Sequence, residues 1–207
     1  NNFCLLVMVN CETDFVGKSE EFVNFVKGIA DAALASEATT LEEVNALKVD
    51  GITVEQKVSE MTGKTGEKLE FDSYAAINGE LVSAYNHLGN KIGTLVALNK
   101  NADGAVEAAH NVAMQVAAMN PVALDKESVP QDVIEKELEI GKELARKEGK
   151  PEAMLDKIAQ GRLGKFFKEN TLLNQEYVKD SKKTVGGYLK ETDKDLTVTG
   201  FFRFALG

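Results

Sequence analysis

The chain opens on a run of seven apolar residues, Phe3 to Val9, and an amphipathic helix pattern begins near Glu20. An uninterrupted apolar run of this length predicts a strand that is buried on both faces. The helix pattern places its apolar residues on one face, and Ser19 stands at the position of an N-cap. Residues 10–19 are therefore predicted to form a loop between a strand and a helix.

The same order of elements returns later in the chain. The segment 95–99, apolar up to Leu98, leads through a polar loop, residues 100–104, into a helix pattern from Val106 to Ala117. We interpret it as a second copy of one strand–loop–helix unit, with a shorter loop that contains no aromatic residue. Weak repeats of this kind also arise by chance in chains that mix strands and helices, so coincidence is the alternative.

Two short helices are predicted between these units. Residues 40–43 read Thr-x-x-Glu and residues 53–56 read Thr-x-x-Gln, and both are capping-box patterns in which the side chains satisfy the first backbone N–H groups of a helix. Each pattern is followed by apolar residues at helical spacing.

Alternating apolar and polar residues then predict two strands, residues 67–77 and 80–87. The Asn78-Gly79 pair between them is the strongest two-residue signal for a β-hairpin turn. A third strand over residues 91–99 would extend this hairpin to a meander. Antiparallel strands with flanking helices make the fold class α+β.

A helical hairpin is predicted within residues 128–178. Apolar or small residues recur there at steps of four, three and four, as in a coiled-coil seam: Ile134, Leu138, Gly141 and Ala145. Pro130 suits a first helical turn, while Gly149 and Pro151 end one helix and begin the next. So short a loop requires antiparallel helices. The pattern leaves open whether the pair projects or packs within the core.

Composition narrows the classes of function. The net charge of −9 and the pI of about 4.9 argue against direct nucleic-acid binding and against an anionic membrane as partner. No apolar stretch approaches the ~20 residues that cross a bilayer. Cys4 and Cys11 would lie roughly 23 Å apart along an extended strand, beyond disulfide reach. We therefore expect both thiols to be reduced, as in the cytosol.

Catalytic and metal-binding patterns find little support. The Gly63-Lys64-Thr65 triplet resembles the end of a phosphate loop, but Val58 stands where that motif needs a glycine. His87 and His110 are expected on unrelated elements, and no Cys or His spacing suits a metal. We predict no catalytic residue, no metal and no cofactor.

Phe15 is the unusual residue of the first loop, because an aromatic ring gains nothing from exposure. Loop aromatics usually fold back onto their own domain, and that is the ordinary interpretation. The alternative is a plug for a partner. The second copy of the unit has no aromatic residue in its loop, which indicates that folding does not need one.

The segment NCETDFVGKSEEF, residues 10–22, resembles the signature of elongation factor Ts, the nucleotide-exchange factor for elongation factor Tu. The pattern Tyr-x-His-x-Gly-x-Lys-Ile-Gly over residues 85–93 is similar to a second motif of that family. Residues 149–185 resemble its coiled-coil region, and the run Val198–Phe204 resembles its last strand. The resemblance covers nearly the whole chain.

The resemblance implies an exchange factor that performs no chemical step. A loop formed by Thr13, Asp14, Phe15 and Val16 would press into the nucleotide domain of elongation factor Tu and disturb the support of Mg²⁺, so that GDP leaves. Phe15 would act as a wedge and Asp14 as a hydrogen-bond acceptor. A second contact, toward another domain of the partner, would include the following residues: Tyr85, His87 and Gly89.

The resemblance also implies two similar subdomains and a protruding coiled coil. We divide the chain into an N-terminal core subdomain (1–77), the first part of a C-terminal core subdomain (78–127), the helical hairpin (128–178) and a return to the core (179–207). A homodimer or a 2:2 complex with the partner is expected, in the bacterial cytoplasm or, alternatively, in an organellar matrix.

The family usually opens with a small helical domain and ends with a further helix, neither of which is recognisable here. The chain begins at Asn1 almost inside a strand, so we expect a fragment with less than full affinity and exchange activity. One rival is an acidic scaffold that binds another helix through its hairpin. An enzyme with an unrecognised site is a weaker one. An exchange factor should lose rate on Phe15→Ala, whereas a scaffold should tolerate it.

Overall fold

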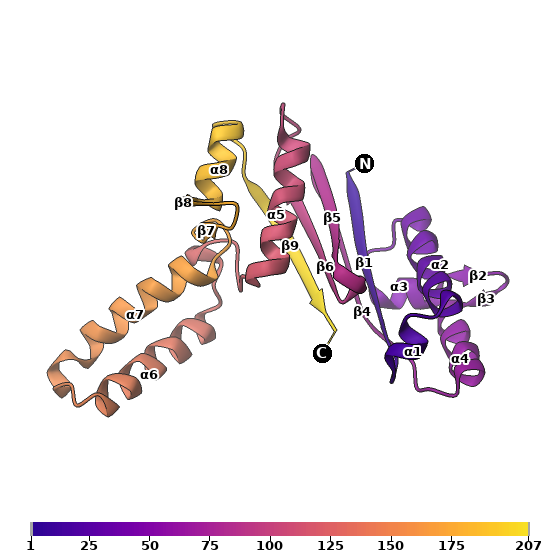
Figure 1. Ribbon diagram of the computed structural model, residues 1–207, viewed down its shortest axis with the longest axis horizontal. Helices are drawn as coiled ribbons and strands as arrows, with labels where there is room; N and C mark the ends of the chain where they lie inside the picture. Colours follow the sequence, from indigo (N-terminus) through magenta and orange to yellow (C-terminus); the bar gives the residue numbers. More distant parts are fainter. Residues whose placement is uncertain (1, 207) are drawn as a thin grey trace.

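The computed structural model describes residues 2–206 (Figure 1). The helices are α1 (Asp14–Gly17), α2 (Glu20–Ser36), α3 (Leu41–Ala46), α4 (Val54–Thr65), α5 (Ala105–Met119), α6 (Gln131–Lys147), α7 (Leu155–Asn170) and α8 (Val185–Thr192). The strands are β1 (Phe3–Asn10), β2 (Lys48–Val49), β3 (Ile52–Thr53), β4 (Glu70–Asn78), β5 (Leu81–His87), β6 (Ile92–Leu98), β7 (Glu176–Tyr177), β8 (Asp180–Thr184) and β9 (Val198–Ala205). Helices combined with small antiparallel sheets confirm the α+β class.

The body of the molecule is layered. Strand β1 pairs antiparallel with β4, and β5, β6 and β9 form a separate three-stranded antiparallel sheet. Helices α2, α3 and α4 lie on the outer side of the β1–β4 pair, while α5 packs on β5 and β6 with α8 beside it (Figure 1). The β1–β4 pair thus lies between helices and the second sheet.

Strand β1 is covered on both faces, as its apolar run predicts. Val9 and its alternate neighbours belong to the core formed with α2, α3 and α4. Leu6 points the other way, into a small core that it shares with Ala75 of β4 and Leu95 of β6. The two sheets approach closely there, since a Cβ added at Gly93 would lie 2.9 Å from Leu6 Cδ2.

The predicted hairpin between β4 and β5 is wrong, and so is the meander built on it. The two strands follow each other in sequence but belong to different sheets. Neither Asn78 nor Gly79 has the positive φ that a type I′ turn requires. The Gly79 N–H instead donates to the Asn2 carbonyl at 3.0 Å. The turn signal is local, whereas β4 pairs with β1, a strand from the start of the chain.

The predicted helix starts are confirmed. The Ser19 hydroxyl caps α2 by accepting the Phe22 N–H at 3.3 Å. Both capping boxes form as predicted, at the start of α3 and of α4, with the N-cap hydroxyl and the side chain three residues later each accepting a backbone N–H. Both strand–loop–helix units are also present, β1 leading to α2 and β6 to α5.

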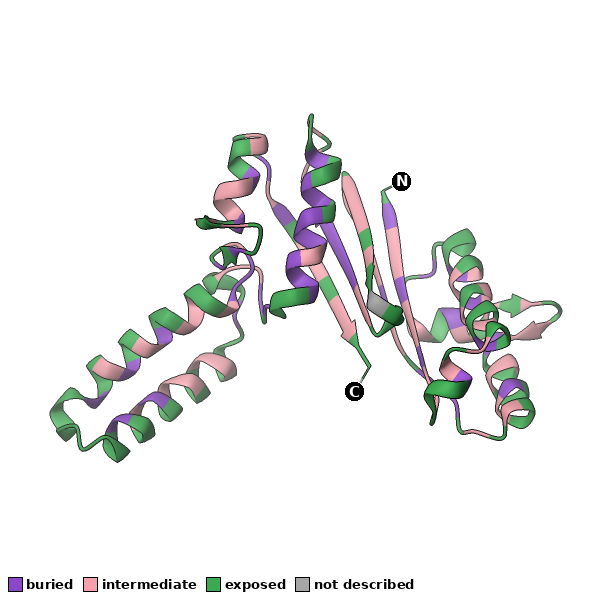
Figure 2. Ribbon diagram, in the orientation of Figure 1, coloured by how far each residue is buried: buried purple, intermediate pink, exposed green. Residues whose placement is uncertain are grey.

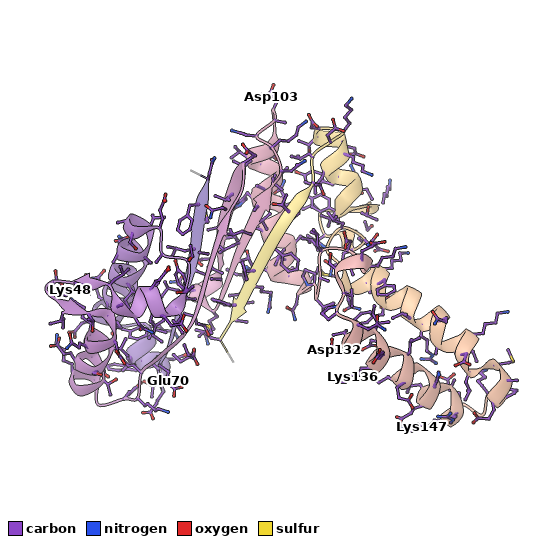
Figure 3. The ribbon with its side chains drawn as sticks, turned by 180° about the vertical axis from the view of Figure 1, so that it is seen from behind. Lys48, Glu70, Asp103, Asp132, Lys136 and Lys147 are labelled. Atoms are coloured by element: carbon purple, nitrogen blue, oxygen red, sulfur yellow. The ribbon has the colours of Figure 1, made fainter. Side chains whose placement is uncertain are left out.

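The predicted helical hairpin is α6 and α7, which project together from the body (Figure 1). Figure 2 shows that its buried positions are confined to the facing sides of the two helices, whereas α5 is buried along most of its length. Charged side chains of α6, among them Asp132, Lys136 and Lys147, extend from the hairpin into solvent (Figure 3). The interpretation in which the pair packs within the core is therefore wrong.

The two helices of the hairpin approach closely at Gly141. A Cβ added there would lie 3.1 Å from the Ala159 Cα and 3.3 Å from its Cβ, so α6 and α7 touch almost backbone to backbone. Pro130 takes the N-cap position of α6, one residue before the predicted first turn. Gly149, with φ of +73°, follows α6 where the sequence predicts its end.

The first prediction tests this contact. Gly141→Val should push the helices apart and destabilise the hairpin by about 1–3 kcal/mol, because the added methyl groups have no space. Urea and thermal unfolding followed by circular dichroism measure the loss. Gly164→Val is the matched control on α7, since a Cβ there meets nothing within 4 Å. Equal stability of the two variants would contradict the close packing.

Candidate functional site

The segment after β1 is an ordered turn, which we call the α1 turn (residues 12–17). The sequence predicts a loop, but residues 14–17 form one helical turn. Thr13 caps it, its Oγ1 accepting the Val16 N–H at 3.3 Å. Val16 is buried in the core with α2, and the Ser19 hydroxyl donates to its carbonyl at 2.8 Å. The turn is thus anchored to the body at its base.

Phe15 is 86% exposed, more than any other large apolar side chain of the described residues. The ordinary interpretation, in which it folds back onto its own domain, is therefore wrong. The reason lies in the helical turn: Val16 takes the position that faces the core, and its neighbour Phe15 is directed away from it. An aromatic ring is held in solvent on a fixed base.

Glu67 binds the start of that turn through three hydrogen bonds. Its Oε2 accepts the backbone N–H groups of Glu12 and Thr13, both at 3.0 Å, and its Oε1 accepts the Thr13 hydroxyl at 2.5 Å. The alternating pattern predicts Glu67 as the start of a strand and gives no sign of this role, whereas β4 begins only at Glu70. No local signal marks a contact with residues so far away in the sequence.

Asp14 lies between two lysines. Its carboxylate accepts a hydrogen bond from Lys18 Nζ at 3.0 Å, and Lys91 Nζ lies 3.5 Å from its other oxygen. The hydrogen bond and charge of Lys18, followed by the charge of Lys91, lower the pKa of Asp14 below its ordinary value. Asp14 is therefore a carboxylate at neutral pH and a ready acceptor.

Lys91 also connects two motifs that are distant in sequence. It stands in the Tyr-x-His-x-Gly-x-Lys pattern, directly before β6, while Asp14 belongs to the α1 turn. The glycine of that pattern, Gly89, has φ of +69° in the tight turn between β5 and β6, a conformation that favours glycine. Packing of β1 against β6 brings the two motifs together.

Tyr85 and His87 lie on the side of the sheet that faces α5. The Tyr85 hydroxyl and His87 Nδ1 are hydrogen-bonded at 2.9 Å, and the Tyr85 ring meets the His110 ring edge to face with centroids 5.6 Å apart. The expectation that the two histidines sit on unrelated elements is wrong, because β5 and α5 bring both against Tyr85. No local pattern in the sequence indicates that His110 is a neighbour of Tyr85.

The remaining candidates from the sequence are the two cysteines and the possible metal ligands. Cys4 and Cys11 are free thiols, and burial raises the pKa of both; the charge of Glu67 raises that of Cys11 further. Within residues 2–206, no group of three or more His, Cys, Asp or Glu side chains is placed to hold a metal ion. None of the helices described combines the length and apolar character needed to cross a membrane.

Comparison with known proteins supplies the family. The family model described as Elongation factor TS matches residues 12–207. The chain belongs to the elongation factor Ts family. It is 51% identical over 207 residues to the elongation factor Ts of Flavobacterium psychrophilum, covering the whole chain and 75% of that relative.

Two further relatives agree. Identity is 49% to the elongation factor Ts of Christiangramia forsetii, over 98% of the chain and 73% of that protein. It is 45% to that of Porphyromonas gingivalis, over the whole chain and 75% of the relative. Membership places the protein among the elongation factors of protein biosynthesis and confirms the resemblance found in its motifs.

The second prediction concerns Asp14. Lys18→Ala should raise the pKa of Asp14 toward the ordinary ~3.9, and Lys91→Ala should raise it less. A carboxyl-detected NMR titration measures both. Because the folded-state pKa is depressed, the stabilisation from ionised Asp14 is present above the unfolded-state pKa and is lost as the pH falls through the folded-state value.

Lys27→Ala is the matched control, since Lys27 pairs with Asp31 at 2.7 Å on α2 and not with Asp14. An Asp14 pKa that stays the same in Lys18→Ala would contradict the hydrogen bond.

Proposed function

We propose that the protein is a guanine-nucleotide exchange factor that binds elongation factor Tu and promotes GDP release. The observation that carries this proposal is Phe15, an aromatic ring that is 86% exposed on an anchored turn. Exposed apolar surface on a rigid support is typical of a contact that a partner covers. Family membership supplies the identity of that partner.

In this proposal the α1 turn enters the nucleotide domain of elongation factor Tu. Phe15 acts as a wedge that disturbs the support of Mg²⁺, and Asp14 accepts a hydrogen bond from the partner. Thr13 and Val16 hold the turn, the first by capping α1 and the second by its burial. No bond is made or broken, so the protein acts without a chemical step and needs no cofactor of its own.

Linkage sets the thermodynamic requirement. The factor must bind nucleotide-free partner more tightly than GDP-bound partner, and GDP must then weaken the factor by the same ratio. Burying one phenylalanine side chain contributes about 1.5–3 kcal/mol, or roughly 10- to 150-fold in an equilibrium constant. If that burial is complete only after GDP leaves, Phe15 alone supplies a useful part of the ratio.

We propose a second contact at Tyr85, His87 and Gly89, toward another domain of the partner. The positive φ of Gly89 forms the tight turn that ends β5, and the hydrogen bond to Tyr85 fixes the His87 ring. The exposed His87 then offers its second ring nitrogen to a partner.

The rival proposal, a scaffold that binds through its hairpin, has one observation in its favour. Ile140 and Leu144 of α6 are 38% and 40% exposed, one helical turn apart, and Met154 at the tip is 46% exposed. This stripe is less exposed than Phe15.

Several coarser features belong to the same proposal. The division at residues 77/78, 127/128 and 178/179 is proposed as the subdomain organisation, and a homodimer or 2:2 complex with the partner as the assembly. The relatives named above are bacterial, which favours the bacterial cytoplasm as the location.

The third prediction is that Phe15→Ala slows GDP release at least about tenfold relative to the wild type, because the wedge loses its ring. The free energy of unfolding should stay within about 0.5 kcal/mol, since an exposed side chain holds little of the fold. Release of a fluorescent GDP analogue from elongation factor Tu is the measurement.

Val106→Ala is the matched control, because Val106 is 66% exposed on α5 and lies outside the proposed contacts. A folded wild type that does not accelerate release contradicts the proposed exchange function. Full activity of Phe15→Ala contradicts the wedge and favours the scaffold.

The fourth prediction separates the second contact from the wedge. His87→Ala should raise the concentration for half-maximal exchange by about tenfold, because a lost contact of moderate strength costs about 1.4 kcal/mol. The maximal rate should change little, since a contact made equally before and after GDP loss affects only affinity. Titration of the exchange rate measures both quantities.

Asn86→Ala is the control from the adjacent position, which points to the opposite face of β5. If the maximal rate falls while the half-maximal concentration stays constant, His87 acts in the release step and not in a separate contact.

A further inference from the structure

We propose that Glu67 is the positioning residue of the α1 turn: its carboxylate fixes the base of the turn and so sets the direction of Phe15 during exchange. This inference rests on the proposed function and deepens it. Glu67 does not touch the partner in this proposal; it acts through Thr13.

Both oxygens of the Glu67 carboxylate are committed to the turn. Oε2 accepts two successive backbone N–H groups, those of Glu12 and Thr13, at 3.0 Å each. Oε1 accepts the Thr13 hydroxyl at 2.5 Å. Hydrogen bonds to an ionised acceptor are shorter and stronger than neutral ones. Three of them converge on two adjacent residues, which is enough to fix their backbone.

The third hydrogen bond carries the effect toward Phe15. Because the Thr13 hydroxyl donates to Glu67, its oxygen is oriented to accept the Val16 N–H, at 3.3 Å. That acceptance is the N-cap of α1, in which Phe15 is the second residue. Loss of an N-cap hydrogen bond frays the first turn of a helix, and α1 consists of a single turn.

Glu67 is itself held in place from both sides. It follows Gly66, whose φ of +70° ends α4, and its N–H donates to the Thr65 hydroxyl at 3.3 Å. Leu69, two residues later, is buried in the core with α2. The carboxylate therefore stands on a fixed segment between α4 and β4, and it can impose an orientation on the turn.

The groups that Glu67 accepts from lie at the surface, since Glu12 and Thr13 are exposed. Without the carboxylate, water would satisfy these donors, and no buried polar group would be left unpaired. Replacing Glu67 should therefore make the α1 turn less ordered while it changes the free energy of unfolding little. That difference distinguishes a positioning residue from a merely structural one.

The exchange assay of the proposed function tests this inference. Glu67→Ala should slow the factor-dependent release of the fluorescent GDP analogue about tenfold, which corresponds to about 1.4 kcal/mol. Glu67→Gln keeps the shape and one acceptor oxygen, so its rate should lie between those of Glu67→Ala and the wild type. Glu70→Ala is the matched control, because Glu70 lies at the same end of the molecule (Figure 3) and pairs with Lys68 instead.

A double-mutant cycle with Phe15→Ala shows whether Glu67 acts through that ring. In the Phe15→Ala background, Glu67→Ala should slow exchange by less than about twofold, because the group to be positioned is already gone. Full additivity of the two substitutions would overturn the inference, and so would a wild-type rate in Glu67→Ala. Unfolding curves of all variants confirm that each is folded.

Amide hydrogen exchange of the free protein gives a readout that does not depend on elongation factor Tu. The Glu12 and Thr13 amides should be protected in the wild type and in Glu70→Ala, and should lose about tenfold of that protection in Glu67→Ala. Unchanged protection would overturn the positioning role even if exchange activity is found. Lost protection in a chain without exchange activity would instead contradict the proposed function while supporting the contact.

Discussion

The packing of the β1–β4 pair against the β5–β6–β9 sheet is the constraint on which the rest of the structure depends. Strand β1 has no free face: α2 covers one side and β6 the other. Gly93 lets Leu6 approach the second sheet, and Gly200 does the same for Ile77, whose Cδ1 would lie 3.1 Å from an added Cβ. A strand clamped in this way ends at a fixed point. The α1 turn begins there, within reach of Lys91, which directly precedes β6.

Fixing the base of the turn has a thermodynamic consequence for binding. A flexible loop that becomes ordered in a complex loses conformational entropy, at a cost of about 1–2 kcal/mol per residue for the backbone alone. In the α1 turn, burial of Val16 and the hydrogen bonds to Glu67 already offset this loss of conformational entropy when the protein folds. The burial energy of the exposed Phe15 ring then remains available for the proposed partner. A rigid base under an exposed tip suits the proposed wedge better than a flexible loop would.

Local patterns predicted the helices of this chain well and its sheet topology badly. The N-cap at Ser19 and the two capping boxes involve residues within one helical turn, so the sequence contains all the partners. The β4–β5 hairpin failed because β1 and β5 both could pair with β4, and tertiary packing decides between them. The β7–β8 hairpin has no strong local pattern either, and it is supported by a contact distant in sequence. Gln115 of α5 accepts the Val178 N–H at 2.9 Å.

The candidate site also contains a residue that the sequence reveals, Phe15, and one that it does not, Glu67. The physical reason differs from the one that applies to the fold. Phe15 could be found because it violates a local rule: an aromatic ring in a polar loop demands an explanation. Glu67 obeys every local rule, since a carboxylate beside a glycine in a polar turn is ordinary. Residues that contact a partner are often improbable for their place in the sequence, whereas the residues that support them are selected for a contact across the fold. A sequence therefore reveals the tip of such a site more readily than the base that holds it.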